Sequence, residues 1–421
     1  MPQVFASPSA APPRSLVGQT VLQIIPSLDA GGAERTTIDI AGALVDAGGR
    51  ALVASAGGRL VSELQARGAI WIPFPADTRN PVAMAWNVAR LARLIRLERP
   101  ALVHARSRAP AWTALGATRL TGTPFVTTFH GSYGGTNALK LRYNSVMARG
   151  DVVIANSDYT GGLVASLYPW AVPQIEVVHR GTDLKAFSPG AVGPGRVEKL
   201  RAEWGVEADE RVVLLAARLT GWKGHRVLIE AAAILKRQGL DGTVFILAGD
   251  PQKRRRYVAE IDAAIAAAGL AGIVRRVGHC ADMPAALRAA SVVAVPSTKP
   301  EAFGRSAVEA QAMGTPVVVT DLGAVPETVL TTPRVPAEAR TGWCVPPDDA
   351  AALAEALGQA LALGASARDA LGQRARAHVA GAFSLERMQG ATLDIYRAVM
   401  AGRRRIVAPA APRPAGADVT S

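Results

Sequence analysis

The sequence predicts an α/β protein built from two doubly wound, parallel-sheet domains. Its 421 residues exceed the size that one hydrophobic core usually serves, so two domains are expected. Runs of β-branched and aliphatic residues alternate with longer helical patterns, which is typical of βαβ units. The composition, 49% hydrophobic, 19% charged and 5% aromatic, favours a packed enzyme over a disordered chain.

The expected strands form two series, separated by the Pro/Gly-rich stretch Ser188–Gly195. The first series comprises Val21–Leu28, Ala51–Ser55, Ile70–Phe74, Ala101–His104, Phe125–His130, Val152–Ala155 and Ile175–His179. The second series comprises Val212–Ala216, Val244–Ala248, Ile273–Val277, Val292–Pro296 and Pro316–Thr320. Each series predicts one domain, because strands that alternate with helices usually build a single parallel sheet.

The ends and the middle of the chain set the domain boundaries. Leu385–Met400 has the apolar spacing of a helix, with Ser384 as a plausible N-cap. The first residues are rich in Pro, Ala and Ser but lack the basic start and apolar core of a secretory signal. The predicted parts are a disordered tail at 1–18, an N-terminal domain at 19–187, a linker at 188–208, a C-terminal domain at 209–384, a helix at 385–401 that crosses back to the N-terminal domain, and a disordered tail at 402–421.

Cysteine usage and hydropathy predict a cytoplasmic protein. Cys280 and Cys344 are the only cysteines, and neither lies in a Cys/His cluster with zinc-site spacing. Reduced thiols are therefore expected. No run approaches the roughly 20 apolar residues of a membrane-spanning helix.

The net charge of +13 raises the question of an anionic partner. Basic runs are confined to Lys253–Arg256 and Arg403–Arg405, and no aromatic residues interleave with them, so nucleic acid is not expected. Residues 1–185 carry 18 Lys+Arg against 11 Asp+Glu. Asn137–Arg149 has a basic amphipathic pattern that either lies on anionic lipid or packs on the sheet with its charges in water.

Two carboxylates, Glu301 and Glu309, flank the start of a helix that follows an expected strand. Gly304, Arg305 and Ser306 lie between them, where backbone N–H groups at a helix N-terminus favour an anion. A glutamate one turn further on can accept hydrogen bonds from a ribose diol. Taken alone, Glu309 is more readily explained as the surface residue of an ordinary amphipathic helix.

Arg218 and Lys223 flank the start of another helix, after strand 212–216. Both cations can point to the carboxyl edge of the sheet, where ligands of open α/β sheets bind. The chain contains no Asp-x-Asp, the usual carboxylate pair for a metal-held nucleotide-sugar. Cations would then have to neutralise a diphosphate leaving group without a metal.

The first domain offers two weaker signals. Gly31 and Gly32 form a Gly-rich turn after the first strand, without the G-x-G-x-x-G fingerprint of dinucleotide sites. His130 ends a strand, where a lone histidine is more often structural than functional.

Together these motifs resemble glycosyltransferase family 4, a retaining family with the GT-B fold of two Rossmann-like domains that face a central cleft. The likeness runs from about Val21 to Met400. Its most specific parts are Glu301-x7-Glu309 with the following Ala312–Val317, Arg218-x4-Lys223-Gly224, and Gly31–Glu34. The sequence around Arg218 is similar to that of bacterial lipopolysaccharide-core sugar transferases.

The resemblance implies a role for each site residue. Arg218 and Lys223 would hold the donor diphosphate, with the backbone near Gly304, Arg305 and Ser306. Glu309 would bind the ribose, and Glu301 and the backbone of Phe303 the transferred sugar. His130 would contact that sugar from the other domain, and Gly31 and Gly32 would let their loop close on the donor. The base would lie beside Val277, Gly278 and His279.

The implied reaction is a metal-independent, retaining transfer of a hexose-type sugar to a hydroxyl of a glycan or glycolipid, without cofactor, in cell-envelope synthesis. No carboxylate is placed as a nucleophile, so front-face substitution is expected, with the departing phosphate taking the proton. Three positions depart from the family pattern: Arg180 replaces Asn, Ala302 replaces Gly, and Arg305 replaces a small or aliphatic residue.

Other functions fit the same architecture. A nucleotide-sugar epimerase or a sugar phosphorylase is an enzymatic alternative, and the phosphorylase would require a pyridoxal phosphate bound to a lysine. A nucleotide-binding protein without catalysis is another, although the intact set of Arg218, Lys223, Glu301 and Glu309 argues against it.

Overall fold

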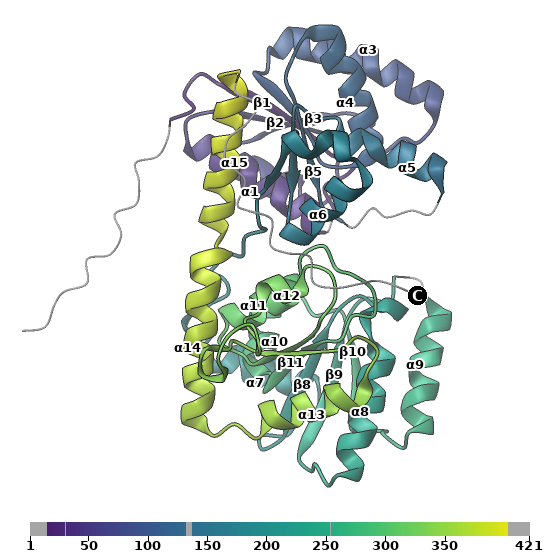
Figure 1. Ribbon diagram of the computed structural model, residues 1–421, viewed down its shortest axis with the longest axis vertical. Helices are drawn as coiled ribbons and strands as arrows, with labels where there is room; N and C mark the ends of the chain where they lie inside the picture. The colour runs from purple at the N-terminus through teal and green to yellow at the C-terminus, as the bar shows by residue number, and fades with distance from the viewer. Residues whose placement is uncertain (1–14, 30, 132–136, 253, 403–421) are drawn as a thin grey trace, which may run out of the picture. The chain divides into compact units, whose positions relative to one another are not determined.

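The computed structural model describes residues 15–29, 31–131, 137–252 and 254–402, and the chain forms two compact units (Figure 1). Unit 1 comprises Met1–Ala155, Leu163–Val178 and Gln389–Ser421. Unit 2 comprises Asn156–Gly162 and His179–Met388. Each unit contains one parallel sheet with helices on both faces, so the predicted fold class is confirmed.

The sheet of unit 1 has the order β3-β2-β1-β4-β5-β6-β7, and all its strand pairs are parallel. The strand order reverses between β1 and β4, which is the doubly wound arrangement. Its strands are β1 (Thr20–Ile24), β2 (Arg50–Ser55), β3 (Ile70–Pro73), β4 (Leu102–Ala105), β5 (Phe125–Phe129), β6 (Val152–Ala155) and β7 (Ile175–Val177).

The sheet of unit 2 has the order β10-β9-β8-β11-β12-β13, again parallel throughout. Here the order reverses between β8 and β11. Its strands are β8 (Arg211–Ala216), β9 (Thr243–Ala248), β10 (Val274–Gly278), β11 (Val292–Val295), β12 (Val317–Thr320) and β13 (Trp343–Val345). The short edge strand β13 was not among the expected strands.

Side-chain alternation explains why both faces of each sheet are covered. In unit 2, Val213 and Leu215 pack with one group of helices, and Val212 and Leu214 with another. The first face is covered by α8 (His225–Arg237), α9 (Arg255–Ala267) and α13 (Ala350–Leu361), and the second by α7 (Pro194–Glu203), α10 (Met283–Ala289) and α11 (Arg305–Ala312).

Unit 1 follows the same rule. One face of its sheet packs on α3 (Pro81–Glu98) and α4 (Arg108–Thr121), and the other on α1 (Gly32–Asp46) and α15 (Leu385–Met400). The remaining helices of the chain are α2 (Val61–Ala66), α5 (Ala138–Asn144), α6 (Asp158–Leu167), α12 (Val325–Thr328) and α14 (Ala365–Ala382), and the 3₁₀ turns are Ser145–Ala148, Pro169–Gln174, Pro189–Ala191, Gly221–Lys223 and Ala337–Ala339.

Two predicted flexible segments differ from expectation. In the N-terminal tail, residues 1–14 lie outside the described residues, but Leu16 is 3% exposed and its N–H donates to the carbonyl of Ala47. The predicted linker at 188–208 contains α7, whose Leu200 and Trp204 are buried in unit 2. Pro194 stands at the first turn of α7, where its missing N–H costs nothing, so the Pro/Gly signal marks a helix start.

The domain boundaries also differ. Asn156–Gly162, placed in the N-terminal domain by sequence, belongs to unit 2, as does the segment from His179. The helix α15 has the expected bounds, and the N–H of Arg387 donates to Ser384 Oγ at 3.3 Å. From Gln389 onward this helix belongs to unit 1. Of the predicted C-terminal tail, residues 403–421 lie outside the described part of the chain.

The expected amphipathic helix Asn137–Arg149 is wrong in extent. The α-helix ends at Asn144 and a 3₁₀ turn follows, in which Val146 and Met147 are fully buried. These two apolar side chains belong to the core of unit 1 and not to an outer face. Leu139, in contrast, is 75% exposed.

Within the residues that the structure describes, no single helix combines the length and the apolar character needed to cross a bilayer. One bent pair, α13 with α14, meets the criteria of length and composition alone.

Candidate active site

The topology of unit 2 brings the predicted site residues to one edge of the sheet. β8 and β11 are neighbours, and the loops that follow both strands leave from their carboxyl ends. The loop after β8 carries Arg218 and Lys223, and the loop after β11 carries Glu301 and leads into α11. In doubly wound sheets the crevice at this reversal of strand order is where ligands bind.

Close backbone contacts fasten the two loops to each other. Gly224 has φ +75°, and a Cβ on it would collide with the carbonyl of Pro296 at the end of β11. Two residues earlier, the carbonyl of Trp222 accepts a hydrogen bond from the N–H of Thr298 at 2.8 Å. The glycine after Lys223 is therefore required by the approach of two loops, and it fixes where the lysine stands.

Lys223 and Glu301 form a buried ion pair. Lys223 Nζ lies 2.8 Å from Glu301 Oε1, and the side chains are 15% and 12% exposed. Ser297 Oγ donates a hydrogen bond to the same oxygen, and the lysine Nζ lies 4.4 Å from the centroid of the Trp222 ring. Sequence reasoning missed Ser297 and Trp222, although a hydroxyl four residues before Glu301 at a strand end was a usable signal.

A second ion pair occupies the first turn of α11. Nε and Nη2 of Arg305 both lie 2.8 Å from Glu309 Oε1, and Glu309 is only 8% exposed. Gly304 caps the helix with φ +92°, where a side chain would be strained. Ser306 Oγ donates to the carbonyl of Ala216 at 3.2 Å, which ties α11 to the end of β8.

The other predicted residues of unit 2 lie at the same edge with different exposure. Arg218 is exposed, and among the described residues its side chain forms no ion pair. Phe303 is 3% exposed and packs edge-to-face on Phe383, so only its backbone is available to a ligand. Val277 and Gly278 end β10, and His279 follows them on the surface.

The predicted residues of unit 1 lie at the carboxyl ends of its strands. Gly31 precedes α1 with φ +153°, and a Cβ there would collide with the carboxylate of Glu34. Gly32 is the first residue of α1, and His130 follows β5. Gly31 therefore meets a backbone requirement, whatever its role toward a ligand.

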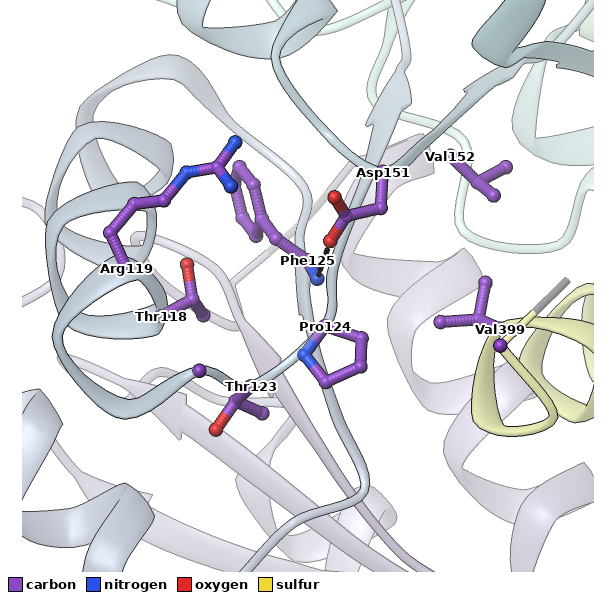
Figure 2. Close-up of a pocket in the computed structure, with 10 residues that line it drawn as sticks. Thr118, Arg119, Thr123, Pro124, Phe125, Asp151, Val152 and Val399 are labelled. Atoms are coloured by element: carbon purple, nitrogen blue, oxygen red, sulfur yellow. Dashed lines mark hydrogen bonds between the residues drawn. The ribbon is translucent and has the colours of Figure 1, made fainter. Parts of the chain in front are cut away.

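A cavity of about 370 Å³ lies in unit 1, away from these strand ends (Figure 2). It is lined by residues that precede or begin β5 and β6, among them Pro124, Phe125 and Asp151, and by Arg119 of α4 and Val399 of α15. The carboxylate of Asp151 already accepts the N–H of Phe125 at 2.8 Å. This cavity opens at the amino edge of the sheet, so it is not the site that the motifs predict.

One cluster of metal-ligand side chains is present in the described residues, outside the predicted site. The ligand atoms of Asp158, His179 and Glu327 lie within 4.8 Å of one another. Glu327 also accepts the N–H groups of Asp158 and Tyr159, at 2.9 and 2.5 Å, and so caps α6. Burial would lower the pKa of His179, but hydrogen bonds to Asp158 and Glu327 outweigh it and raise the pKa to about 9. At neutral pH an imidazolium therefore supplies the positive charge of this cluster.

Replacing His179 with glutamine is expected to destabilise unit 2 at pH 6 but not at pH 10. The folded-state pKa of about 9 exceeds the unfolded value near 6.5, so this stabilisation is complete below pH 6.5 and is lost as the pH rises through 9. Because Asp158 is 70% exposed, we expect the replacement to lower the free energy of unfolding at pH 6 by only about 1–2 kcal/mol. Urea unfolding of both proteins at the two pH values measures it, and a difference that does not change with pH would contradict it.

Comparisons with known proteins match this chain to glycosyltransferases. The family described as glycosyl transferases group 1 matches residues 196–378, and Glycosyltransferase Family 4 matches residues 30–186. A D-inositol 3-phosphate glycosyltransferase of Mycobacterium tuberculosis is 35% identical over 257 residues, which is 60% of this chain. The match spans 49% of that relative, so the chain covers about half the length of the curated relatives it matches.

Solved structures match over nearly the whole chain. A glycosyltransferase from Rickettsia africae has a TM-score of 0.82 and 32% identity, with 91% of this chain and 98% of that chain covered. Anabaena HepE in complex with UDP and glucose has a TM-score of 0.76 and 26% identity, with 90% and 100% covered.

Proposed function

Because this chain belongs to glycosyltransferase family 4, we propose that it transfers a hexose-type sugar from a nucleoside diphosphate sugar to a hydroxyl of a glycan or glycolipid, with retention of configuration. The observation that carries the proposal is the pair of ion pairs at one sheet edge, Lys223 with Glu301 and Arg305 with Glu309. The cations at this edge suit a diphosphate, and the two carboxylates suit the hydroxyls of a ribose and of a sugar.

The donor diphosphate binds to Arg218, Lys223 and the backbone N–H groups that begin α11. These N–H groups have no intrahelical partner, and they favour an anion together with the helix dipole. Glu309 accepts the ribose hydroxyls, and the base lies beside Val277, Gly278 and His279. UDP in the HepE complex is the type of nucleotide that such a site takes.

Glu301 binds the hydroxyls of the transferred sugar and does not act as a general base. Lys223 and Ser297 both donate to Glu301 Oε1, and these hydrogen bonds hold the carboxylate in one orientation. The proton of the attacking hydroxyl then passes to the departing phosphate oxygen, whose negative charge the two cations stabilise.

The donor is expected to bind and react without a metal ion, because cations of the chain neutralise the diphosphate. A thermal-shift screen of nucleoside diphosphates and their sugars in excess EDTA tests this. A ligand at 100 times its dissociation constant adds about 2.7 kcal/mol of apparent stability. We expect a shift with one nucleotide series and turnover that persists in EDTA. Complete loss of turnover that magnesium reverses would disprove the metal-free mechanism.

The acceptor is proposed to be lipid-linked and to be met at an anionic membrane surface, as in lipopolysaccharide-core synthesis. A basic aromatic patch on unit 1 supports this. Its members are Leu139, Lys140, Arg142, Tyr143, Arg149 and Trp170. The Arg149 guanidinium lies 5.5 Å from the Trp170 ring, which is 51% exposed, and Tyr168 Oη donates to the Leu141 carbonyl at 2.9 Å. These contacts bring the segment around Trp170 beside the segment that ends at Arg149.

The protein is expected to sediment with anionic vesicles at low salt and not with neutral ones. Each basic residue near such a surface contributes about 1 kcal/mol, so the three cations of the basic aromatic patch suffice for reversible attachment. Replacing Trp170 with serine should weaken attachment, whereas the same change at Trp86, a 70% exposed tryptophan of α3, serves as the control. Equal binding to both vesicle types, or to neither, would indicate a soluble acceptor.

A further inference from the structure

Arg305 occupies an unusual position in unit 2. It is the first residue of α11, where the helix dipole is positive and a cation is disfavoured. Its guanidinium is 45% exposed and contacts Glu309 through two nitrogens, both 2.8 Å from Oε1. Arg305 is the exposed partner of this pair, because the Glu309 side chain is only 8% exposed. The helix dipole therefore does not explain why this turn carries an arginine.

The Arg305–Glu309 pair places a cation beside the proposed positions of the donor diphosphate and of the ribose. Glu309 lies one turn from the helix N-terminus where the diphosphate binds, and Arg305 lies at that N-terminus. Lys223 is likewise paired with a glutamate, since its Nζ lies 2.8 Å from Glu301 Oε1. A guanidinium has five N–H donors in a planar fork, so it can bind a carboxylate and a phosphate oxygen together.

We propose that Arg305 is a nucleotide-recognition residue that shares its guanidinium between Glu309 and the donor diphosphate. The inference rests on the proposed function and extends it from the backbone of residue 305 to its side chain. Arg305 then acts with Arg218 and Lys223 as a third cation at the diphosphate, and it orients the carboxylate that receives the ribose. An aliphatic residue at this position, as in the family pattern, would do neither.

A double-mutant cycle on nucleotide binding tests the proposal. Affinities of UDP, GDP and ADP are measured by calorimetry for the wild type, Arg305→Leu, Glu309→Gln and the double variant. If the guanidinium contacts the diphosphate, Arg305→Leu should weaken binding of the preferred nucleotide by about tenfold or more, both in the wild type and in the Glu309→Gln background. Arg305→Lys should retain part of the affinity, because it keeps the charge but not the fork.

The control is Lys199→Leu, which removes the cation of an i,i+4 pair exposed on both sides, with Glu203 on α7, and should leave affinity within about twofold of wild type. If Arg305→Leu has no effect in the Glu309→Gln background, the arginine acts only by holding Glu309 and the proposal is wrong. Unchanged affinity in Arg305→Leu itself also overturns it. A wild type that binds none of the three nucleotides contradicts the proposed function instead. Should Arg305→Leu fail to fold, wild-type affinity in Arg305→Gln would overturn the proposal equally.

Discussion

Arg218→Ala and Lys223→Ala are each expected to lower kcat by about thirty- to several-hundred-fold. Removing a cation that stabilises the leaving diphosphate costs on the order of 2–4 kcal/mol in the transition state. Arg218 gives the cleaner test, because its side chain is exposed and forms no ion pair among the described residues, so its loss should hardly change the free energy of unfolding. Steady-state kinetics with saturating donor measure the effect.

Lys223→Ala also leaves the buried carboxylate of Glu301 without its cation, and breaking such a pair costs about 3–5 kcal/mol of stability. Comparing Lys223→Ala with Lys223→Met/Glu301→Gln separates the two effects. The double variant should regain stability, since no buried charge is left unpaired, but it should stay inactive. Near-wild-type turnover in either Arg218→Ala or Lys223→Ala would show that the residue is a surface cation.

Unit 2 is expected to lose about 3 kcal/mol of stability between pH 6.5 and pH 4 through His225 alone. This histidine begins α8 and is fully buried, and its Nδ1 lies 3.4 Å from the Tyr257 hydroxyl. Burial lowers its pKa to about 4, a backbone hydrogen bond to Thr220 opposes the shift, and the charge of Lys223 adds to it. Between pH 6.5 and pH 4, the unfolded chain therefore binds a proton at His225 that the folded chain does not bind.

The sign follows from that difference in proton binding. Stability from a neutral His225 is complete above pH 6.5 and falls by about 1.4 kcal/mol for each pH unit below it, until the folded-state pKa is reached. His225→Gln cannot take up the proton, so its stability should fall less than that of the wild type between pH 7 and pH 4. Chemical unfolding at both values measures this. Parallel losses in the two proteins would show that His225 does not control acid stability.

Most of the strands were predictable because they carry the runs of Val, Ile and Leu that a parallel sheet covered on both faces requires. Leu385–Met400 was predictable with its bounds, since a single apolar stripe repeats over sixteen residues. β13 was not, because Trp343–Val345 spans only three residues at an edge and gives no periodic signal. α7 was mistaken for a linker because Pro194 and Gly195 resemble loop residues unless the proline stands at a helix start.

The candidate site was predictable as a set of residues but not as a set of contacts. Arg305 and Glu309 are four apart, so their pairing follows from helix geometry. Lys223 and Glu301 come from loops after two different strands. Their Nζ and Oε1 atoms lie 2.8 Å apart only because β8 and β11 are adjacent in the sheet. Asp158 and Glu327 are further apart still in sequence, and a boundary drawn at residue 187 separated them.

The order in which a ribosome delivers this chain has a consequence for unit 1. His104 of β4 and Tyr396 of α15 are both fully buried, and the His104 Nδ1 and Tyr396 Oη atoms lie 2.7 Å apart. The sheet that holds His104 emerges early, whereas α15 emerges only after all of unit 2 has been translated. Until then one face of the nascent sheet is covered by α1 but lacks α15, the second of its two helices. Unit 1 therefore cannot finish folding before α15 has been synthesised, and a fragment that stops before Gln389 would retain that uncovered surface.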